Sequence, residues 1–187
     1  MIAAILTISD RCFAGKAVDA SGPALAAICQ HQLGAQVFAT AVVPDDVPAI
    51  QRQLRHWATV SPSVDLILTT GGTGLAPRDC TPEATAGILE RRHPALLELA
   101  RYRCLARTPR AFLSRGECGT LGRSLIINLP GSPRGAAEFL EALLDVLPHA
   151  VTMLRGEDLD HGGTAQRKTD ADRYHSQFGT NNLQGPP

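Results

Sequence analysis

The chain has 187 residues, of which 44% are apolar and 4% aromatic, and its formal net charge at pH 7 is zero. This length suits one domain with a sizeable core, and zero net charge excludes an overall attraction to nucleic acid or to a membrane surface. The aromatic residues are also too few and too scattered to form base-stacking platforms. The five cysteines are odd in number and lack C-x-x-C spacing, which indicates reduced thiols.

Two further patterns concern the location of the protein. No apolar run approaches the roughly 20 residues of a membrane span. The N-terminal stretch MIAAILTISDR has no basic region and no cleavage site of a signal peptide. We therefore expect a soluble, cytoplasmic protein.

The first half of the chain alternates short apolar runs with helical patterns. A helix is predicted to open at Ser21-Gly22-Pro23, and another has an apolar side formed by Val47, Ile50, Leu54 and Trp57. The apolar runs that predict strands are residues 2–8, 36–43 and 64–68. Strands that alternate with helices indicate a mostly parallel sheet.

The second half adds helices and a possible antiparallel excursion. Helices are predicted over residues 82–90, from Pro94, from Pro133 and over residues 148–154. Residues 111–115 and 124–129 are predicted as strands around a glycine-rich turn at residues 116–122. The expected fold is α/β, with three layers (α/β/α) and helices on both faces of the sheet.

Apolar periodicity stops after Arg155, which sets the expected domain boundary. We predict one domain over residues 1–156 and a polar C-terminal tail over residues 157–187. The composition of the tail favours disorder, and the alternative is an arm on a neighbouring subunit. We find no internal repeat and no second domain.

Residues 64–85 are the most informative stretch. The third strand runs into Gly71-Gly72-Thr73-Gly74, and Thr81 and Pro82 are a predicted N-cap and first helical residue. About ten residues separate this strand from the next helix, whereas such connections usually take roughly 2–6. Glycines can direct N–H groups at a phosphate, although a tight turn alone is the alternative. The loop is neither a Walker P-loop nor a G-x-G-x-x-G motif.

Polar residues follow each of the parallel strands at its carboxyl end. In doubly wound folds ligands bind outside these ends, so four polar strand exits are expected to meet at one cleft. The exits are Ser9-Asp10-Arg11, Pro44-Asp45-Asp46, residues 71–79 and residues 128–132.

Carboxylates repel a phosphate group unless a metal ion lies between them. Asp45 and Asp79 therefore suggest Mg²⁺, which takes carboxylate and phosphate oxygens together and would serve phosphoryl or nucleotidyl transfer. The alternatives are helix capping for Asp45 or Asp46 and a loop ion pair with an arginine such as Arg78 for Asp79.

Other candidate groups have structural alternatives as well. Seven arginines between Arg91 and Arg115 form either a solvated, salt-bridged face or a basic rim that attracts a phosphorylated small molecule. Cys80 is either a nucleophile or a small buried filler, and Ser114 either binds substrate or bonds locally. The six histidines have no metal-ligand spacing.

Several short motifs occur in register along residues 2–156. They are SDR after the first strand, S-G-P at the first helix, P-D-D after the second strand, TTGGTG with P-R-D-x-T-P-E-A-T, L-S-R, and I-I-N-L-P-G-S-P. Together they resemble the molybdopterin adenylyltransferase family, which includes the gephyrin G domain. The resemblance implies a homotrimer that joins molybdopterin to AMP from MgATP and releases pyrophosphate, with a molybdenum-insertion protein as a partner.

The resemblance also implies roles for individual residues. It places the two acidic catalytic positions, with Mg²⁺ bound there, on Asp45 and Asp79. The positions that match pterin-phosphate contacts are Thr70, Gly71, Gly72, Thr73, Gly74 and Ser114. The positions that match the lining of the cleft are Ser9, Asp10, Asn128, Pro130, Gly131 and Ser132.

Two other functions remain open from the sequence. Related domains keep the fold and bind the pterin without turnover, and relatives of the competence-damage-inducible domain act on other nucleotides. The presence of Asp45 and Asp79 favours catalysis over a non-catalytic binding module. Turnover of a nucleotide without pterin would support a relative of the competence-damage-inducible domain.

Overall fold

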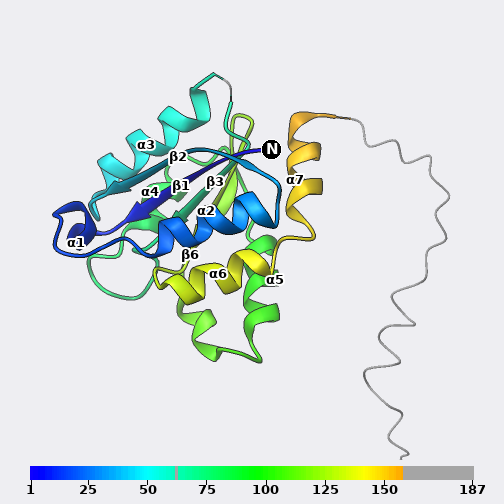
Figure 1. Ribbon diagram of the computed structural model, residues 1–187. Helices are drawn as coiled ribbons and strands as arrows, with labels where there is room; N and C mark the ends of the chain where they lie inside the picture. Colours follow the sequence, from blue (N-terminus) through cyan, green and yellow to red (C-terminus); the bar gives the residue numbers. More distant parts are fainter. Residues whose placement is uncertain (62, 158–187) are drawn as a thin grey trace, which may run out of the picture.

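The computed structural model describes residues 1–61 and 63–157, which form a mixed sheet with helices on both faces (Figure 1). The strands are β1 Ile2–Ile8, β2 Gln36–Val43, β3 Leu66–Thr70, β4 Arg91–Arg92, β5 Cys118–Leu121 and β6 Ser124–Leu129. The helices are α1 Asp10–Phe13, α2 Ser21–His31, α3 Val47–Thr59, α4 Thr81–Ala86, α5 Ala95–Cys104, the 3₁₀ helix η1 Pro109–Leu113, α6 Pro133–Glu141 and α7 Leu147–Arg155.

The six strands lie in the order β2-β1-β3-β6-β5-β4. The first four run parallel, and β5 pairs antiparallel with both β6 and β4. This arrangement confirms the predicted α/β fold with a mostly parallel sheet and an antiparallel excursion. Most of the expected tail, residues 158–187, lies outside the described residues, so the predicted division into domain and tail stays a prediction.

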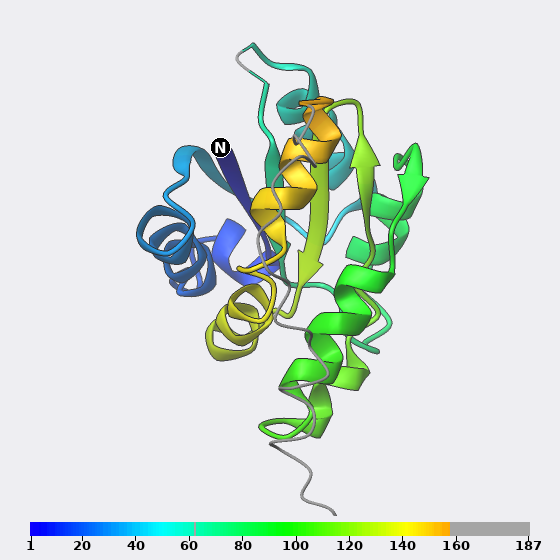
Figure 2. The same ribbon diagram turned by 90° about the vertical axis from the view of Figure 1, so that its right-hand side faces the viewer.

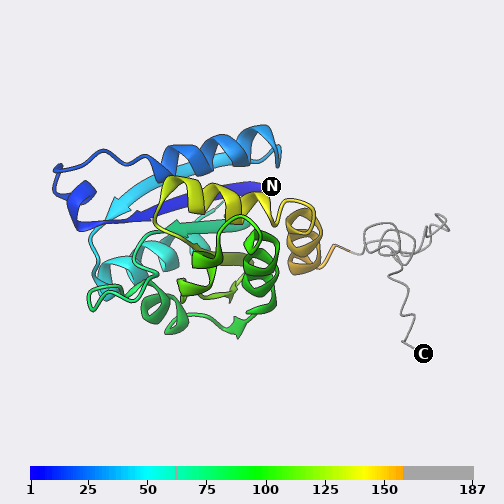
Figure 3. The same ribbon diagram turned by 90° about the horizontal axis from the view of Figure 1, so that it is seen from below.

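Side chains of the central strands alternate between two cores, as the period of two in a strand requires. In β1, Ala3 and Ile5 pack into one core, and Ala4 and Leu6 pack into the other. The first core is closed by apolar side chains of α2, α5, α6 and α7, and the second by those of α3 and α4. Figure 3 shows α2 and α6 side by side on one face of the sheet. The three layers follow directly from this alternation.

One predicted strand is wrong. Residues 111–115 were expected to be extended, but Pro109–Leu113 is a 3₁₀ helix, in which the amide of Ala111 donates to the carbonyl of Thr108 at 3.0 Å. Pro109 favours this first turn because its ring fixes φ and it has no amide to satisfy. The partner of β6 is instead Cys118–Leu121, within the expected turn. Gly122, at φ 56°, provides the tight reversal between β5 and β6.

The carboxyl ends of the parallel strands lie in register. Thr70 of β3 is opposite Thr7 of β1 and Leu129 of β6, and Ile8 of β1 is opposite Val43 of β2. The four loops that follow these strands therefore leave the sheet at one edge, as the sequence predicted. The described residues include no helix with the length and apolar character that a membrane span requires.

At the amino ends of the parallel strands, a buried carboxylate joins the sheet to α7. Asp65 is 4% exposed and accepts hydrogen bonds from the amide of Ile2 at 2.6 Å and from Nε and Nη2 of Arg155 at 2.9 and 2.5 Å. Arg155 ends α7, which Figure 2 shows alongside β6. Burial raises the pKa of Asp65, but the hydrogen bonds and charge of Arg155 outweigh it and lower the pKa overall.

We expect Asp65→Asn to lower the free energy of unfolding at pH 7 by about 2 kcal/mol, because hydrogen bonds to a charged group are lost. Asp145→Asn is the matched control. It breaks the exposed pair of Arg103 and Asp145 and should cost less than about 1 kcal/mol. Urea unfolding of the three proteins measures both values.

The effect of Asp65 should also depend on pH in a defined direction. Because folding lowers its pKa, the carboxylate stabilises the fold above its ordinary pKa of about 3.9, and this contribution is lost as the pH falls through the lowered value. The free energy of unfolding of the wild type should therefore approach that of Asp65→Asn as the pH falls below about 4. A difference that stays constant down to about pH 2 would contradict this assignment.

Candidate substrate site

The glycine loop after β3 is pressed against the end of β1. Gly71 has φ 101°, and a Cβ at this position would lie 2.1 Å from the carbonyl oxygen of Ile8. No side chain is compatible with either the φ or the contact. Gly72, at φ 61°, continues the left-handed turn. The loop therefore brings its own backbone, rather than side chains, to the edge of the sheet.

Thr81 fixes this loop from the start of α4. Its hydroxyl donates to the carbonyl of Gly71 at 2.8 Å, and its amide donates to the carbonyl of Gly72 at 3.1 Å. The prediction that Thr81 is an N-cap is wrong, because Thr81 is the first residue of α4 and its hydroxyl is used by the loop. Pro82, predicted as the first helical residue, is the second residue of α4 and lies in its first turn.

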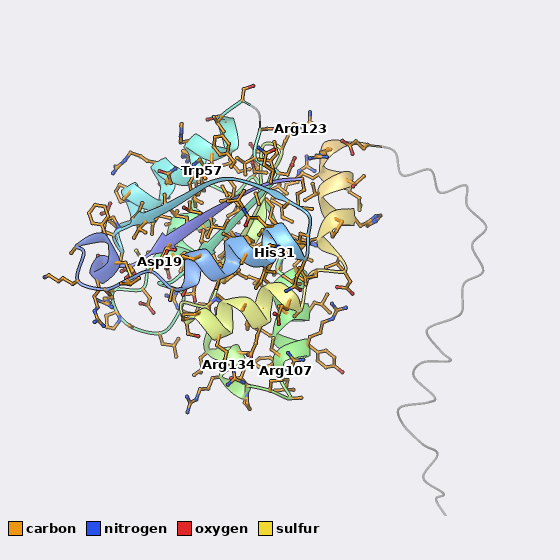
Figure 4. All side chains as sticks on the ribbon, viewed as in Figure 1. Asp19, His31, Trp57, Arg107, Arg123 and Arg134 are labelled. Atoms are coloured by element: carbon orange, nitrogen blue, oxygen red, sulfur yellow. The ribbon has the colours of Figure 1, made fainter. Side chains whose placement is uncertain are left out.

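A cavity of about 490 Å³ opens beside the loop, between η1 and α6. It contains many of the residues that the sequence predicted for the site: Gly72, Thr73, Gly74, Asp79, Ser114, Pro130, Gly131 and Ser132. Arg107, Arg110 and Arg134 also line it, and Figure 4 shows Arg107 and Arg134 beneath α6. The larger cavity thus combines a backbone loop with cationic side chains.

A smaller cavity of about 220 Å³ lies on the other side of the loop. Four predicted site residues line it: Ser9, Thr70, Gly71 and Gly131. Gly131 lines both cavities, and a Cβ there would lie 3.1 Å from Cα of Gly71. The two cavities therefore adjoin where the backbones of Gly71 and Gly131 touch.

The boundary between the cavities is held by two hydroxyl groups. Thr70 donates to the carbonyl of Pro130 at 2.7 Å, and Ser21 donates to the carbonyl of Gly131 at 3.0 Å. The side chain of Thr70, predicted as a pterin contact, is thus used within the protein, and the whole residue is buried. These bonds fix the loop after β6 relative to β3 and α2.

Asp19 is a residue of the site that the sequence reasoning missed. It lines the smaller cavity, accepts from the hydroxyl of Thr7 at 2.7 Å, and accepts from the amides of Ser21 and Gly22 at 3.0 Å each (Figure 4). Its place just before the Ser-Gly-Pro helix start was the available signal, because an aspartate there can accept hydrogen bonds from the first amides of the helix. Its carboxylate joins β1 to the start of α2.

Asp45 and Asp10 hold each other in place. Oδ2 of Asp45 accepts from the amide of Asp10, and Oδ1 of Asp10 accepts from the amide of Asp45, both at 3.0 Å. Oδ1 of Asp45 lies 3.0 Å from where a Cβ of Gly72 would be. Helix capping belongs to the neighbouring Asp46, which accepts from the amide of Ala49 at 2.8 Å. Asp45 is therefore left to face the glycine loop.

Asp79 faces the same loop from the other end. It lines the larger cavity, and its Oδ2 lies 2.8 Å from where a Cβ of Gly74 would be. The alternative, a loop ion pair of Asp79 with an arginine such as Arg78, is not formed among the described residues, where Arg78 instead approaches Oδ2 of Asp10 at 3.9 Å. Asp45 and Asp79 thus flank the glycine loop at Gly72 and Gly74.

Two predicted site residues are occupied by the protein itself. Asn128 is fully buried, and its side-chain amide donates to the hydroxyls of Thr69 at 2.9 Å and Thr85 at 3.0 Å. It lines neither of the two cavities. The hydroxyl of Ser114 lies 3.3 Å from that of Thr73, at the wall of the larger cavity.

The arginine-rich stretch divides into two groups: the first bonds other residues of the protein, as a salt-bridged face would, and the second lies where a basic rim was predicted, whose attraction for a phosphorylated molecule stays a prediction. Arg103 binds Asp145, Arg101 donates to the carbonyl of Ser114, and Arg115 binds Glu83. Arg107 and Arg110 instead line the larger cavity. This second group forms the basic rim that the sequence analysis considered.

The environment of Cys80 disfavours a nucleophilic role. Burial raises the pKa of its thiol, and the negative charges of Asp45 and Glu83 raise it further. The thiolate is therefore disfavoured at neutral pH, and the residue is a partly buried filler at the start of α4.

Comparison with known proteins identifies the family. The family described as "Probable molybdopterin binding domain" matches residues 4–149. The chain is 42% identical over 173 residues to the molybdenum cofactor synthesis protein cinnamon of Drosophila melanogaster, covering 90% of this chain and 27% of that protein. It is 38% identical over 153 residues to the molybdopterin adenylyltransferase of Helicobacter pylori, covering 81% of this chain and 86% of that protein.

A solved structure agrees with these sequence matches. The molybdopterin biosynthesis enzyme MoaB of Thermus thermophilus superposes with a TM-score of 0.78 at 50% identity, covering 83% of this chain and 97% of that chain. The present chain spans about a quarter of the cinnamon protein but nearly the whole of the two shorter relatives. The resemblance drawn from the motifs is confirmed, and the chain belongs to the molybdopterin-binding domain family of molybdenum cofactor biosynthesis.

Proposed function

We propose that this chain is a molybdopterin adenylyltransferase, which transfers AMP from ATP to the phosphate of molybdopterin and releases pyrophosphate. The observation that carries the proposal is the pair of cavities that adjoin at Gly71 and Gly131, with Asp45 and Asp79 flanking the loop between them. Two adjoining cavities suit a reaction that joins two substrates. The name of the Helicobacter pylori relative supports the same reaction.

In this proposal the larger cavity binds the pterin substrate. Its wall combines the glycine loop, whose backbone amides suit a phosphate group, with Arg107, Arg110 and Arg134, which suit an anion. The nucleotide enters from the smaller cavity, which is bounded by Ser9, Asp19 and the loop after β6. The reacting phosphates then meet at the contact of Gly71 and Gly131.

The acidic residues fit Mg²⁺ delivered with the nucleotide. No group of three metal-binding side chains occurs among the described residues, whereas Mg²⁺ commonly binds through one or two carboxylates together with substrate phosphates. Asp45 and Asp79 would provide those carboxylates. When bound, the ion supplies positive charge that offsets the charge developing on the α-phosphate.

The protein itself positions the reactants. The phosphate of the pterin is already ionised at neutral pH, so its oxygen can attack the α-phosphate in line without a general base. Thr81 and Thr70 hold the carbonyls of Gly71 and Pro130, which keeps the loop rigid at the point of attack. The homotrimer, the cytoplasmic location and a molybdenum-insertion partner belong to this proposal as well.

The first test replaces each acidic residue in turn. Asp79→Asn and Asp45→Asn should each lower kcat by about 10²- to 10³-fold, because charge stabilisation at the reacting phosphate is lost, while binding of molybdopterin persists. The assay is mass-spectrometric detection of adenylylated molybdopterin formed from MgATP and molybdopterin, with binding measured by fluorescence.

Asp46→Asn is the matched control for Asp45→Asn. Asp46 caps α3, and asparagine is an equally good N-cap, so both stability and kcat should stay near those of the wild type. Full activity of Asp79→Asn would remove Asp79 from the mechanism. Binding of the pterin by the wild type without product at saturating MgATP would favour the non-catalytic binding module.

The second test concerns the basic rim. Replacing both Arg107 and Arg110 with Gln should raise the KM for molybdopterin by about tenfold at low salt, with a smaller effect at high salt, because the rim attracts an anion. Replacement of Arg91 and Arg92, on the edge strand β4, removes the same charge elsewhere and should leave KM unchanged. Equal effects of the two double variants would show that only overall charge matters.

A further inference from the structure

Arg115 spans the two ends of the loop that carries Asp79. Its amide donates to the carbonyl of Thr73 at 2.8 Å, its Nε donates to the carbonyl of Gly74 at 2.8 Å, and its Nη2 donates to the carbonyl of Asp79 at 2.9 Å. Its Nη1 binds the carboxylate of Glu83 in α4. One residue therefore holds three carbonyls of one loop.

Besides Arg115, residues 73–79 are held by the hydroxyl of Ser114, which bonds that of Thr73 at 3.3 Å, and by the long ion pair of Arg78 with Asp10 at 3.9 Å. Residues 75–78 are exposed, and the internal hydrogen bond of this arc runs from the amide of Asp79 to the carbonyl of Ala76 at 2.9 Å. Exposed segments with few buried contacts open easily. Arg115 therefore supplies three of the hydrogen bonds that hold the backbone of the segment carrying Asp79.

The segment that carries Arg115 is bonded to β6, a central strand of the sheet. The next residue, Gly116, is packed so closely on β6 that a Cβ there would lie 2.7 Å from the carbonyl oxygen of Asn128. The amide of Glu117 donates to Oδ1 of Asn128 at 3.0 Å, and the amide of Asn128 donates to the carbonyl of Glu117 at 2.9 Å. The buried Asn128 thus anchors the segment from which Arg115 reaches the loop.

We infer that Arg115 is a positioning residue, which fixes residues 73–79 so that Asp79 meets the substrates correctly. This inference rests on the proposed function for its catalytic part, since Asp79 matters only if that reaction occurs. A guanidinium is suited to the task because its planar fork donates in several fixed directions, whereas a lysine ammonium provides a single flexible point of contact. Arg115 does not line either cavity, so it acts through the loop.

The test is the conservative variant Arg115→Lys, which keeps the charge but loses the fork. We expect kcat to fall by about 10²-fold, the effect of a small misplacement of a catalytic group, with a much smaller change in the KM for molybdopterin. Amide hydrogen exchange in residues 73–79 of the free protein should become about tenfold faster or more, because charge-assisted hydrogen bonds are lost.

Arg101→Lys is the matched control. Arg101 donates to the carbonyls of Ser114 at 3.0 Å and Gly116 at 3.5 Å, on either side of Arg115, and not to the carbonyls of residues 73–79. Its variant should keep kcat within about twofold and leave exchange in residues 73–79 unchanged. Glu83→Gln removes the charge partner of Arg115 alone and should give an intermediate acceleration of exchange.

The exchange and kcat measurements together decide whether Arg115 positions residues 73–79. Unchanged exchange in residues 73–79 of Arg115→Lys, or a kcat equal to that of Arg101→Lys, would overturn the inference. Equal acceleration in β1 and in the loop would also overturn it, because the role would then be global stability. If the wild type forms no adenylylated product, the proposed function fails, and the exchange measurement alone decides whether Arg115 holds the loop.

Discussion

The site depends on the close approach of the backbone of Gly71 to the carbonyl of Ile8, which is the tightest among the glycines that the structure describes. A Cβ at Gly71 would lie 2.1 Å from that oxygen, and a Cβ at Gly131, in the loop after β6, would lie 3.1 Å from Cα of Gly71. The backbones that follow β1, β3 and β6 therefore approach one another closely, and the hydroxyl of Thr70 adds a bond to the carbonyl of Pro130. Because no side chain intervenes, main-chain amides are left free to face a ligand, and the two cavities adjoin at this point.

This arrangement makes many polar residues structural. The hydroxyls of Thr70 and Thr81 and the amide of Asn128 are each used to hold a loop or a neighbouring strand. Buried polar groups must be hydrogen-bonded, and no buried side-chain nitrogen or oxygen among the described residues lacks a partner. A residue in a motif at the site is therefore as often a support for the loop as a contact for the substrate.

The sequence allowed the sheet to be predicted well, because buried parallel strands are nearly continuous apolar runs. The bounds of β1, β2 and β6 agree with the predicted ones. The prediction of a strand over residues 111–115 failed because the short apolar run Ala111-Phe112-Leu113 is compatible with a strand or with a helical turn, and Pro109 favours the turn. The partners of Arg78 and Arg115 were not predictable either, since ion pairs depend on how distant loops are placed.

Zero net charge conceals a separation of charge across the glycine loop. Arg107, Arg110 and Arg134 outnumber the acidic residues Asp79 and Glu138 in the lining of the larger cavity, whereas Asp10 and Asp45 line neither cavity and bond each other beside the loop. An anionic substrate alone would be drawn to the arginine side and repelled by the carboxylates. A nucleotide that brings its own Mg²⁺ would instead be favoured on the acidic side. In the proposed reaction the pterin would therefore lie beside the arginines and the metal-bound phosphates on the side of Asp45, whereas Asp79, which lines the larger cavity, would face the point where the two substrates meet.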